Sequence, residues 1–535
     1  MRDFKVYNLL NNLSASKLNL RTKLARPVNT PFYLGLAWGI FTLVLFVATN
    51  GNLEFHTDEL ITYRVIQETW WEIARERLGA THSPVYFWLV KPLYSISDDP
   101  HILRLPSALF SAIGVGVMVA ALGSAISARI ANIYAIGLMT CPGWIFIAHF
   151  ARPYAMLAML MMLGMASLLV ILSRALANEP DTAGQPETPT RHWIILSVTT
   201  ALAPAVLMSG ALYVAALSFT PLLNTDLRRN REFVAKWWRA MLPGLVSAAL
   251  FSWLLSSAII RKSDAYWADR RFPLSVDSLI RVTSGTFSSI DPSWTSASGT
   301  LEAVIAIAGV ALVLGAFLLR SRQRALFWTA LPAAIVLPLL YVLISFKTSL
   351  MVERYFYLTT PGLFGLIAIS VDYLWRKRIG AGLLLILLSC LILQAFNAHF
   401  WPHARILWRN AVEVVLNARH DSDLVVVYPS NRALMVKIIL DYEFSLDENI
   451  EALPGPGSYE ELDDLIDASI ESHGRIWIID KWQRRNVGAI LDRRSDLVGC
   501  RMGQRSRPLY VITKAATPNL LPKTCEAYGE TPGSG

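Results

Sequence analysis

Apolar runs long enough to cross a lipid bilayer dominate this sequence of 535 residues. A membrane-spanning helix needs about 17 to 25 mainly apolar residues. Runs of that length cover residues 31–49, 104–126, 130–148, 153–173, 240–260, 301–319, 326–345, 355–374 and 379–397. Charged residues make up only 17% of the chain, against about 25% in soluble proteins. The sequence therefore predicts an α-helical membrane protein that crosses the bilayer many times.

Residues 193–223 form a longer apolar stretch, which we interpret as two helices. Pro204 and Gly210 interrupt its middle, as expected at a turn. Arg191 precedes the stretch and Arg228 follows it, so both of its ends favour the cytoplasm. We therefore predict a helical hairpin, which brings the number of spans to about eleven.

The distribution of lysine and arginine predicts how these spans are oriented. With residues 1–30 as a cytoplasmic segment, short loops rich in lysine and arginine also fall on the cytoplasmic side, as the positive-inside rule requires. Those loops carry Arg129, Arg174, Arg320, Arg322, Arg324, Arg376, Lys377 and Arg378. No cleavable signal peptide is evident, so the first apolar run is expected to act as an uncleaved anchor. Two long loops, 50–103 and 261–300, then face the opposite compartment together with everything after residue 398.

The C-terminal part of the chain has the pattern of a soluble domain. Residues 423–428 and 475–480 are predicted strands, and 404–418, 431–443, 458–472 and 484–494 are predicted helices. This alternation favours a small α/β domain over residues 398–535, after a transmembrane domain over 31–397.

Only two of the four cysteines are placed to form a disulfide bond. Cys141 and Cys390 lie inside apolar runs, whereas Cys500 and Cys525 lie in the polar C-terminal part. A bond between Cys500 and Cys525 is therefore plausible if this part faces an oxidising compartment.

An acidic pair, Asp58-Glu59, stands in the first long external loop at the start of an amphipathic stretch from Leu60 to Leu78. This stretch predicts a helix on the membrane surface, with Thr57 as its cap. Acidic residues in a first helical turn also stabilise a helix through its dipole. The pair on its own therefore fits either a stabilising or a catalytic role.

Several short motifs together resemble those of the GT-C membrane glycosyltransferases. The motifs are Asp58-Glu59, Thr81-His82-Ser83-Pro84-Val85-Tyr86-Phe87-Trp88, Arg104-Leu105-Pro106-Ser107, Ala151-Arg152-Pro153-Tyr154-Ala155 and Glu353-Arg354-Tyr355. The most similar branch contains the protein O-mannosyltransferases and the aminoarabinose and galacturonic acid transferases of lipid A. The resemblance covers roughly residues 30–397. It departs from the family at Ser83, which replaces a proline, and at His82, where some relatives have lysine.

The resemblance implies a fold and an activity. The fold is a GT-C type membrane domain, and the activity is transfer of a sugar from a polyprenyl phosphate to an acceptor on the outer membrane face, generally with inversion. Asp58 matches one position of the family's catalytic acidic pair, where a carboxylate acts as general base and accepts the proton of the attacking acceptor. Glu59 is the second member of the pair and helps to orient the site or to bind.

The departing polyprenyl phosphate requires cationic donors on the external side. The candidate substrate-binding residues are His82, Arg104, Arg152, Tyr154, Arg261, Arg270, Lys347 and Arg354. Arg261 and Arg270 also have an alternative role, in which they pair with Asp264 and Asp269 on a solvated surface. No tight spacing of metal ligands is present, so no metal and no cofactor are predicted.

The expected partners are a polyprenyl-phosphate-linked sugar, a lipid, glycan or protein acceptor, and membrane lipids. Nucleic acid is not expected, because the net charge of +9 is scattered over short loops. A lipid or glycan transporter or flippase is the main alternative, although the span centres carry few of the charges that mark a transport path. A catalytically silent membrane scaffold is a third possible function. The expected location is a bacterial inner membrane with the site facing the periplasm.

Overall fold

The structure of the protein is a computed structural model. It describes residues 30–50, 57–79, 82–97, 100–176, 189–263, 273–287, 296–400, 414–415, 417–420, 422–428, 450–451, 459–480, 486–502, 509–518, 521–522 and 526–527.

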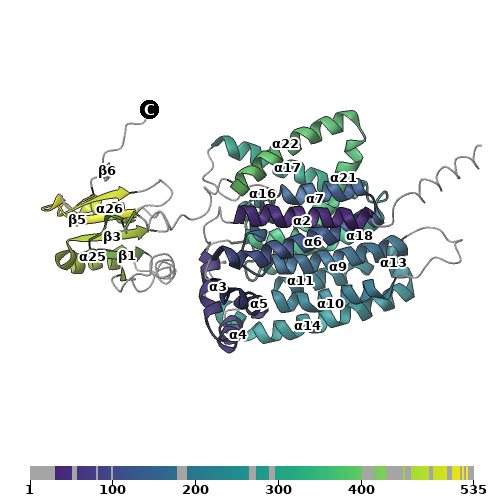
Figure 1. The fold of residues 1–535 in the computed structure, drawn as a ribbon, viewed down its shortest axis with the longest axis horizontal. Coiled ribbons are helices and arrows are strands. Elements are labelled where there is room, and N and C mark those ends of the chain that lie inside the picture. Colours follow the sequence, from purple (N-terminus) through teal and green to yellow (C-terminus); the bar gives the residue numbers. More distant parts are fainter. Residues whose placement is uncertain are drawn as a thin grey trace, which may run out of the picture. The chain divides into compact units, whose positions relative to one another are not determined.

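The chain divides into two compact units, which we describe one at a time (Figure 1). The first, called the helical unit, comprises Met1–Asn52 and Thr69–Trp401. The second, called the α/β unit, comprises Leu53–Glu68 and Pro402–Gly535. The segment with the acidic pair thus groups with the C-terminal residues. The domain ranges 1–30, 31–397 and 398–535 stay a prediction.

All the apolar runs predicted to span the membrane are helical in the structure. The helices of the helical unit are α2 (Thr30–Asn50), α4 (Trp70–Gly79), α5 (Val85–Tyr94), η1 (Pro100–Arg104), α6 (Leu105–Ala125), α7 (Ala128–Met139), α8 (Pro142–Ala148), α9 (Tyr154–Ala175), α10 (Thr190–Val206), α11 (Ser209–Ser218), α12 (Thr220–Leu223), α13 (Thr225–Arg229), α14 (Arg231–Ser263), α16 (Val276–Phe287), α17 (Ser296–Leu318), α18 (Arg324–Leu331), η2 (Pro332–Val336), α19 (Leu337–Ser345), α20 (Glu353–Phe356), η3 (Tyr357–Thr359), α21 (Thr360–Trp375) and α22 (Arg378–Phe400). Within the described residues, six helices are long and apolar enough to cross a membrane, or seven if one bent pair counts as a span. The total of about eleven stays a prediction.

Two breaks in the apolar runs have local causes. The predicted span 130–148 is two helices, α7 and α8, bent by 73°. Pro142 begins α8, and a residue before proline is disfavoured in the helical region, so Cys141 is extended and ends the continuous helix. In 193–223 the break falls between α10 and α11, after Pro204 and before Gly210, as predicted.

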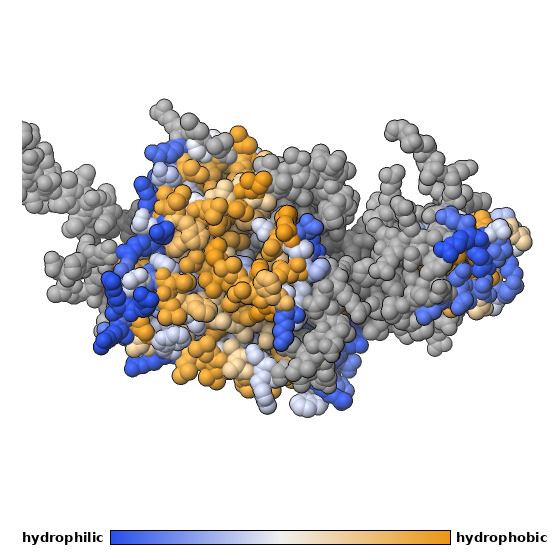
Figure 2. All heavy atoms as spheres, turned by 180° about the vertical axis from the view of Figure 1, so that it is seen from behind, coloured by the Kyte–Doolittle hydropathy of each residue, from blue (hydrophilic) through white to orange (hydrophobic). Residues whose placement is uncertain are grey.

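The outer surface of the helical unit is strongly apolar. Figure 2 shows hydrophobic side chains over most of the described surface of this unit that is in view. Large exposed apolar side chains lie on several helices, among them Val44 on α2, Trp253 on α14, Leu318 on α17 and Ile386 on α22. Exposing a continuous apolar surface of this kind to water is unfavourable for a monomer, whereas lipid tails would cover it.

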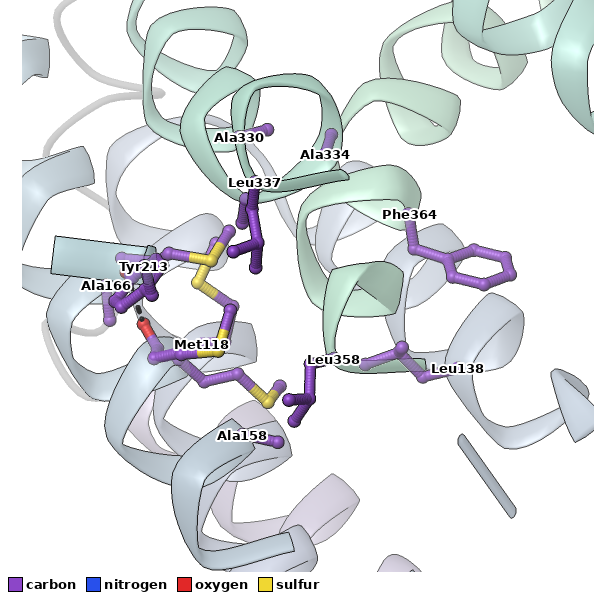
Figure 3. Packing of buried hydrophobic residues seen from close by; sticks show 14 of the residues in the cluster. Met118, Leu138, Ala158, Ala166, Tyr213, Ala330, Ala334, Leu337, Leu358 and Phe364 are labelled. Atoms are coloured by element: carbon purple, nitrogen blue, oxygen red, sulfur yellow. Dashed lines mark hydrogen bonds between the residues drawn. The ribbon is translucent and has the colours of Figure 1, made fainter. Parts of the chain in front are cut away.

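Small residues allow the helices to approach one another closely. A side chain carbon at Gly35 of α2 would lie 2.4 Å from the carbonyl oxygen of Gly116 on α6, so only glycine fits there. The core around α9 mixes such small residues with larger ones (Figure 3). It includes Met118, Leu138, Ala158 and Leu358, all buried.

The single amphipathic helix predicted from Leu60 to Leu78 is wrong: the structure has α3 (Thr57–Gln67) and α4 (Trp70–Gly79) instead. Thr69 and Glu72 form a reciprocal capping box, in which each side chain accepts a backbone N–H of the other at 3.3 Å and 3.0 Å. This cap starts a new helix at Trp70 and ends the first. The side chain of Thr57 lies outside the described residues.

The α/β unit contains one mixed sheet in the order β2-β1-β3-β5-β4-β6. Its strands are β1 (Leu424–Tyr428), β2 (Ile450–Glu451), β3 (Arg475–Asp480), β4 (Leu497–Met502), β5 (Leu509–Lys514) and β6 (Glu526–Ala527), and its helices are α25 (Tyr459–His473) and α26 (Asn486–Arg493), besides α3. Strands β2, β1 and β3 are parallel, and the others pair antiparallel. The predicted strands 423–428 and 475–480 are confirmed, and β4 and β5 were not predicted. The predicted helices 404–418 and 431–443 lie largely outside the described residues.

A buried ion pair fixes the register of β1 and β3. The guanidinium of Arg475 donates Nε–H to Oδ1 of Asp423 at 2.9 Å and forms a second contact through Nη2. The indole N–H of Trp477 donates to Oδ2 of the same carboxylate at 2.8 Å. All three side chains are buried, so the pair stabilises only the register in which these groups meet.

The cysteines are in two different states. Cys141 and Cys390 are free, and Cys500 is disulfide-bonded. Cys525 lies outside the described residues, two positions before Ala527, which pairs with Cys500 across β6 and β4.

Candidate active site

Arg152 lies on the tight turn that leads into α9. Its backbone N–H donates to the carbonyl of Phe150 at 2.7 Å, and Pro153 is the residue before the helix begins. The side chain is almost fully buried, with 3% of the residue exposed. Among the residues that the structure describes, none accepts a hydrogen bond from its Nε or Nη1.

An aromatic ring brings a second arginine to Arg152. The guanidinium carbon of Arg152 lies 5.8 Å from the centroid of Phe87, and that of Arg77 lies 5.2 Å from the same centroid. The carbonyl of Arg77 accepts the backbone N–H of His82 at 2.9 Å. We call Arg77, His82, Phe87 and Arg152 the Phe87 cluster. Arg77 also forms an ion pair with Glu76.

Hydrogen bonds between the predicted motifs hold this cluster in place. Tyr86 on α5 and Ser107 on α6 have their hydroxyls 3.4 Å apart, and Ser107 donates to the carbonyl of Phe150 at 2.7 Å. Ser83 donates to the carbonyl of Ala205 at the end of α10. Three motifs that are distant in the sequence therefore converge on the turn that carries Arg152.

Arg104, another predicted binding residue, is tied to the scaffold. It is fully buried, and its Nη1 donates to the carbonyl of Asn50 at 2.9 Å. This bond joins the end of α2 to the start of α6. Its role as a phosphate ligand stays a prediction.

Tyr154, two positions after Arg152, belongs to a row of aromatic rings. Its ring stacks on Phe150, with centroids 5.8 Å apart and planes at 20°. Tyr355 lies 6.4 Å from Tyr154 and 6.3 Å from Tyr341, again between centroids. The motif with Tyr154 and the motif with Tyr355 thus face one another.

Arg354 lies at the start of α20, where a long-range ion pair orients the chain. Arg281 on α16 contacts Glu353 at 3.1 Å and donates to the carbonyl of Met351 at 3.3 Å. Sequence reasoning did not single out Arg281, because nothing local indicates that it pairs with a residue in another predicted loop. Lys347, by contrast, is exposed.

Asp58 and Glu59 lie in the first turn of α3, within the α/β unit. Asp58 is half-buried and Glu59 is fully buried. The carbonyl of Asp58 accepts a hydrogen bond from the hydroxyl of Thr62 at 3.4 Å. The side chain of Arg261 and the whole of Arg270 lie outside the described residues. No group of three or more potential metal ligands occurs in the described part of the chain.

The chemistry of the Phe87 cluster favours an anion. A guanidinium presents a planar fork of N–H donors that matches the oxygens of a phosphate or carboxylate. In the cluster two such groups contact one ring, and within the described residues Nε and Nη1 of Arg152 have no acceptor. The aromatic face lowers the cost of burying them.

Comparisons with known proteins identify the fold. No protein-family model matches the chain, and no curated protein matches it by sequence. Among solved structures, ArnT from Cupriavidus metallidurans in the apo state is similar, with a TM-score of 0.52 and 13% identity. The match covers 90% of this chain and 98% of that one. This chain has the GT-C fold.

Two other structures match this chain with lower scores. ArnT from the same organism bound to undecaprenyl phosphate has a TM-score of 0.49 and 14% identity, covering 92% of this chain and 99% of that one. The Archaeoglobus fulgidus oligosaccharyltransferase in the apo form has a TM-score of 0.47 and 11% identity, covering 87% and 71%. The similarity to the apo ArnT structure, with its TM-score of 0.52, confirms the expected architecture of a helical membrane domain with a small C-terminal α/β domain.

Proposed function

We propose that this chain is a membrane glycosyltransferase that moves a sugar from a polyprenyl phosphate to an acceptor on the periplasmic face of a bacterial inner membrane. The GT-C fold and the matching motifs support this class of activity. The acceptor is proposed to be lipid A, another envelope glycan or a protein. Which sugar is transferred depends on the shape of a pocket that sequence motifs do not define.

The buried guanidinium of Arg152 is the observation that carries the proposal. Burying N–H donors of a charged group without acceptors is costly, and a bound anion would remove that cost. The phosphate of a lipid-linked sugar supplies such an anion. Arg77 lies against the same ring, and the backbone of His82 is bonded to Arg77. Both are proposed to add donors, while Arg354, Lys347, Arg261 and Arg270 remain further candidate ligands.

The proposed reaction is a displacement at the anomeric carbon of the sugar. The acceptor oxygen attacks this carbon and forms the new glycosidic bond as the bond from carbon to the phosphate oxygen breaks. The electron pair of the broken bond stays on the phosphate, whose charge Arg152 stabilises. The acceptor proton passes to a carboxylate acting as general base. We assign this role to Asp58, with Glu59 orienting it, on the resemblance of the Asp58-Glu59 motif and not on its position relative to Arg152.

The test is transfer by the purified full chain supplied with a polyprenyl-phosphate sugar and envelope lipids. We expect Asp58→Asn to lower the transfer rate by about 10²–10⁴-fold, because the proton acceptor is lost. Asp277→Asn is the matched control, since Asp277 is also an aspartate in the first turn of a helix. Asp277 is exposed and Asp58 is half-buried. Transfer by Asp58→Asn at the wild-type rate would remove Asp58 from this role.

The same assay separates the enzyme from a flippase. An enzyme releases free polyprenyl phosphate and adds the sugar to the acceptor in equal amounts. A flippase would move the intact lipid-linked sugar between leaflets and release neither product.

A further inference from the structure

A cavity of 480 Å³ lies in the helical unit between α7, α17, α21 and α22. Apolar side chains form most of its wall; they include Ile136, Leu312, Phe364, Leu387 and Leu391. Its volume falls in the range of about 300–1,000 Å³ that is usual for ligand sites. We call it the α7–α22 cavity. None of the four residues of the Phe87 cluster lines it.

The wall of this cavity depends on a glycine of α7. A side chain carbon at Gly137 would lie 2.3 Å from the ring of Phe364 on α21, so a larger residue would displace that ring. Figure 3 shows the Phe364 ring pointing away from Met118 and Tyr213 of the central core. The ring therefore forms a wall of the cavity and does not fill the centre of the unit.

The cavity is accessible from the lipid-facing surface. Ile133 and Ile136 of α7, and Leu387 and Leu388 of α22, are half-buried although they line it. Neighbouring residues of α22, such as Leu385, are exposed. A lipid chain in the bilayer would thus enter sideways between α7 and α22.

One end of the cavity is polar and positively charged. Arg129 lines it, and its Nε contacts Oδ1 of Asp372 at 2.5 Å. Arg376 contacts Oδ2 of the same carboxylate at 2.8 Å, so two guanidiniums share one negative charge. Their side chains remain 45% and 56% exposed. Lys377, also exposed, follows directly.

We propose that the α7–α22 cavity binds one acyl chain of an anionic phospholipid, whose phosphate contacts Arg129 and Arg376. The apolar wall matches the acyl chain, and the excess positive charge at one end matches the headgroup. Trp375, which lines the same end and is 44% exposed, is placed as interfacial tryptophans are. By the arginine pattern this lipid comes from the cytoplasmic leaflet, on the side opposite the proposed reaction.

The test uses the full chain in phosphatidylcholine nanodiscs that contain a trace of phosphatidylglycerol with a photoreactive acyl chain. After illumination, crosslinked peptides are identified by mass spectrometry. We expect crosslinks on α7 and α22, and competition by unlabelled phosphatidylglycerol. Leu388→Trp, which fills the cavity, should abolish them. Leu385→Trp is the matched control, because it adds the same side chain on the exposed face of the same helix.

The headgroup is tested by charge. Arg376→Gln should weaken crosslinking about fivefold, the contribution of one basic residue near a membrane surface. Asp372 keeps Arg129 as a partner in this variant, so the fold is preserved. Arg239→Gln, which removes an exposed charge from α14, should have no effect.

Three results would overturn the proposal. Equal crosslinking by photoreactive phosphatidylcholine would show that the cavity does not select an anionic headgroup. Equal crosslinking in Leu388→Trp would place the chain elsewhere. Stronger competition by undecaprenyl phosphate than by phosphatidylglycerol would assign the cavity to a prenyl carrier. None of these readouts depends on sugar transfer.

Discussion

Arg152 in the helical unit and Arg475 in the α/β unit are almost equally buried, with exposed fractions of 3% and 4%. Each guanidinium carbon lies 5.8 Å from the centroid of an aromatic ring, Phe87 for the first and Trp477 for the second. They differ in their hydrogen bonds. Arg475 is paired with the carboxylate of Asp423, whereas two N–H groups of Arg152 have no acceptor in the described part of the chain.

This difference separates two uses of a buried charge. A charge whose donors are satisfied within the protein stabilises one arrangement of the backbone, and removing it leaves its partner buried alone. A buried charge whose N–H donors lack acceptors stabilises the protein less when no ligand is bound, and those donors can bind an anion. Burial is the same in both cases, so the pairing indicates the role.

The largest effect is expected from Arg475→Met. The variant leaves the carboxylate of Asp423 buried without its charged partner, which should lower the free energy of unfolding of the α/β unit by about 3–5 kcal/mol. Hydrogen exchange of the β1 and β3 amides in the full chain measures this. Arg475→Met combined with Asp423→Leu should recover much of the loss. Unchanged exchange in the single variant would remove the stabilising role of Arg475.

For Arg152→Met we expect the opposite balance. The free energy of unfolding should stay the same or rise, because a costly buried group is removed. Affinity for a polyprenyl-phosphate donor should fall about tenfold to hundredfold with the loss of a charge-assisted hydrogen bond. Binding of a labelled donor and thermal unfolding measure the two quantities. Arg152→Lys should restore only part of the affinity, because it keeps the charge and loses the planar fork. A loss of free energy of unfolding as large as that in Arg475→Met would show that both arginines have a structural role.

A smaller effect is expected from Phe87→Leu. The substitution keeps an apolar side chain under both guanidiniums and removes the cation–π attraction, which contributes about 0.5–2 kcal/mol. We expect KM for the donor to rise and kcat to change little. A change confined to kcat would show that the ring acts on the reacting atoms and not on binding.

The smallest effect concerns Arg494, a half-buried arginine that pairs with the exposed Asp496. Its guanidinium holds the pKa of Asp496 at about 2, below the usual value of 3.8. A lowered pKa stabilises the folded state above about pH 4, and the contribution is lost as the pH falls towards 2. High salt should weaken the effect, because the pair is exposed. Comparing acid unfolding of the wild type with Asp496→Asn, at low and high salt, measures it; identical curves at low salt would contradict it.

Much of the helical unit could be predicted because span length and apolarity are local properties. The breaks were also encoded locally but are easier to overlook. Pro142 bends α7–α8, and the Thr69-x-x-Glu72 pattern starts α4 inside what was predicted to be one helix. In the α/β unit the apolar run of β5 was a signal that the prediction missed.

For the candidate site, the sequence indicated residue types but not their neighbours. Arg152 and His82 were candidates because they belong to motifs. Phe87 belongs to one of the motifs but is not a candidate from the sequence, and Arg77 is in none of them. Their roles arise only when α4, α5 and the turn before α9 pack together. The pairing of Arg281 with Glu353 was equally invisible, since 71 positions lie between them and no local pattern connects them.

The disulfide bond at Cys500 makes the maturation of this chain depend on where its C-terminal part is delivered. Such bonds persist in oxidising compartments and are reduced in the cytosol. A molecule inserted in the opposite orientation would keep Cys500 as a buried thiol on β4, between β5 and β6. With the C-terminal part on the proposed periplasmic side, the oxidation state of this one residue would mark correct membrane insertion, which thiol-specific reagents applied to the unfolded chain can read.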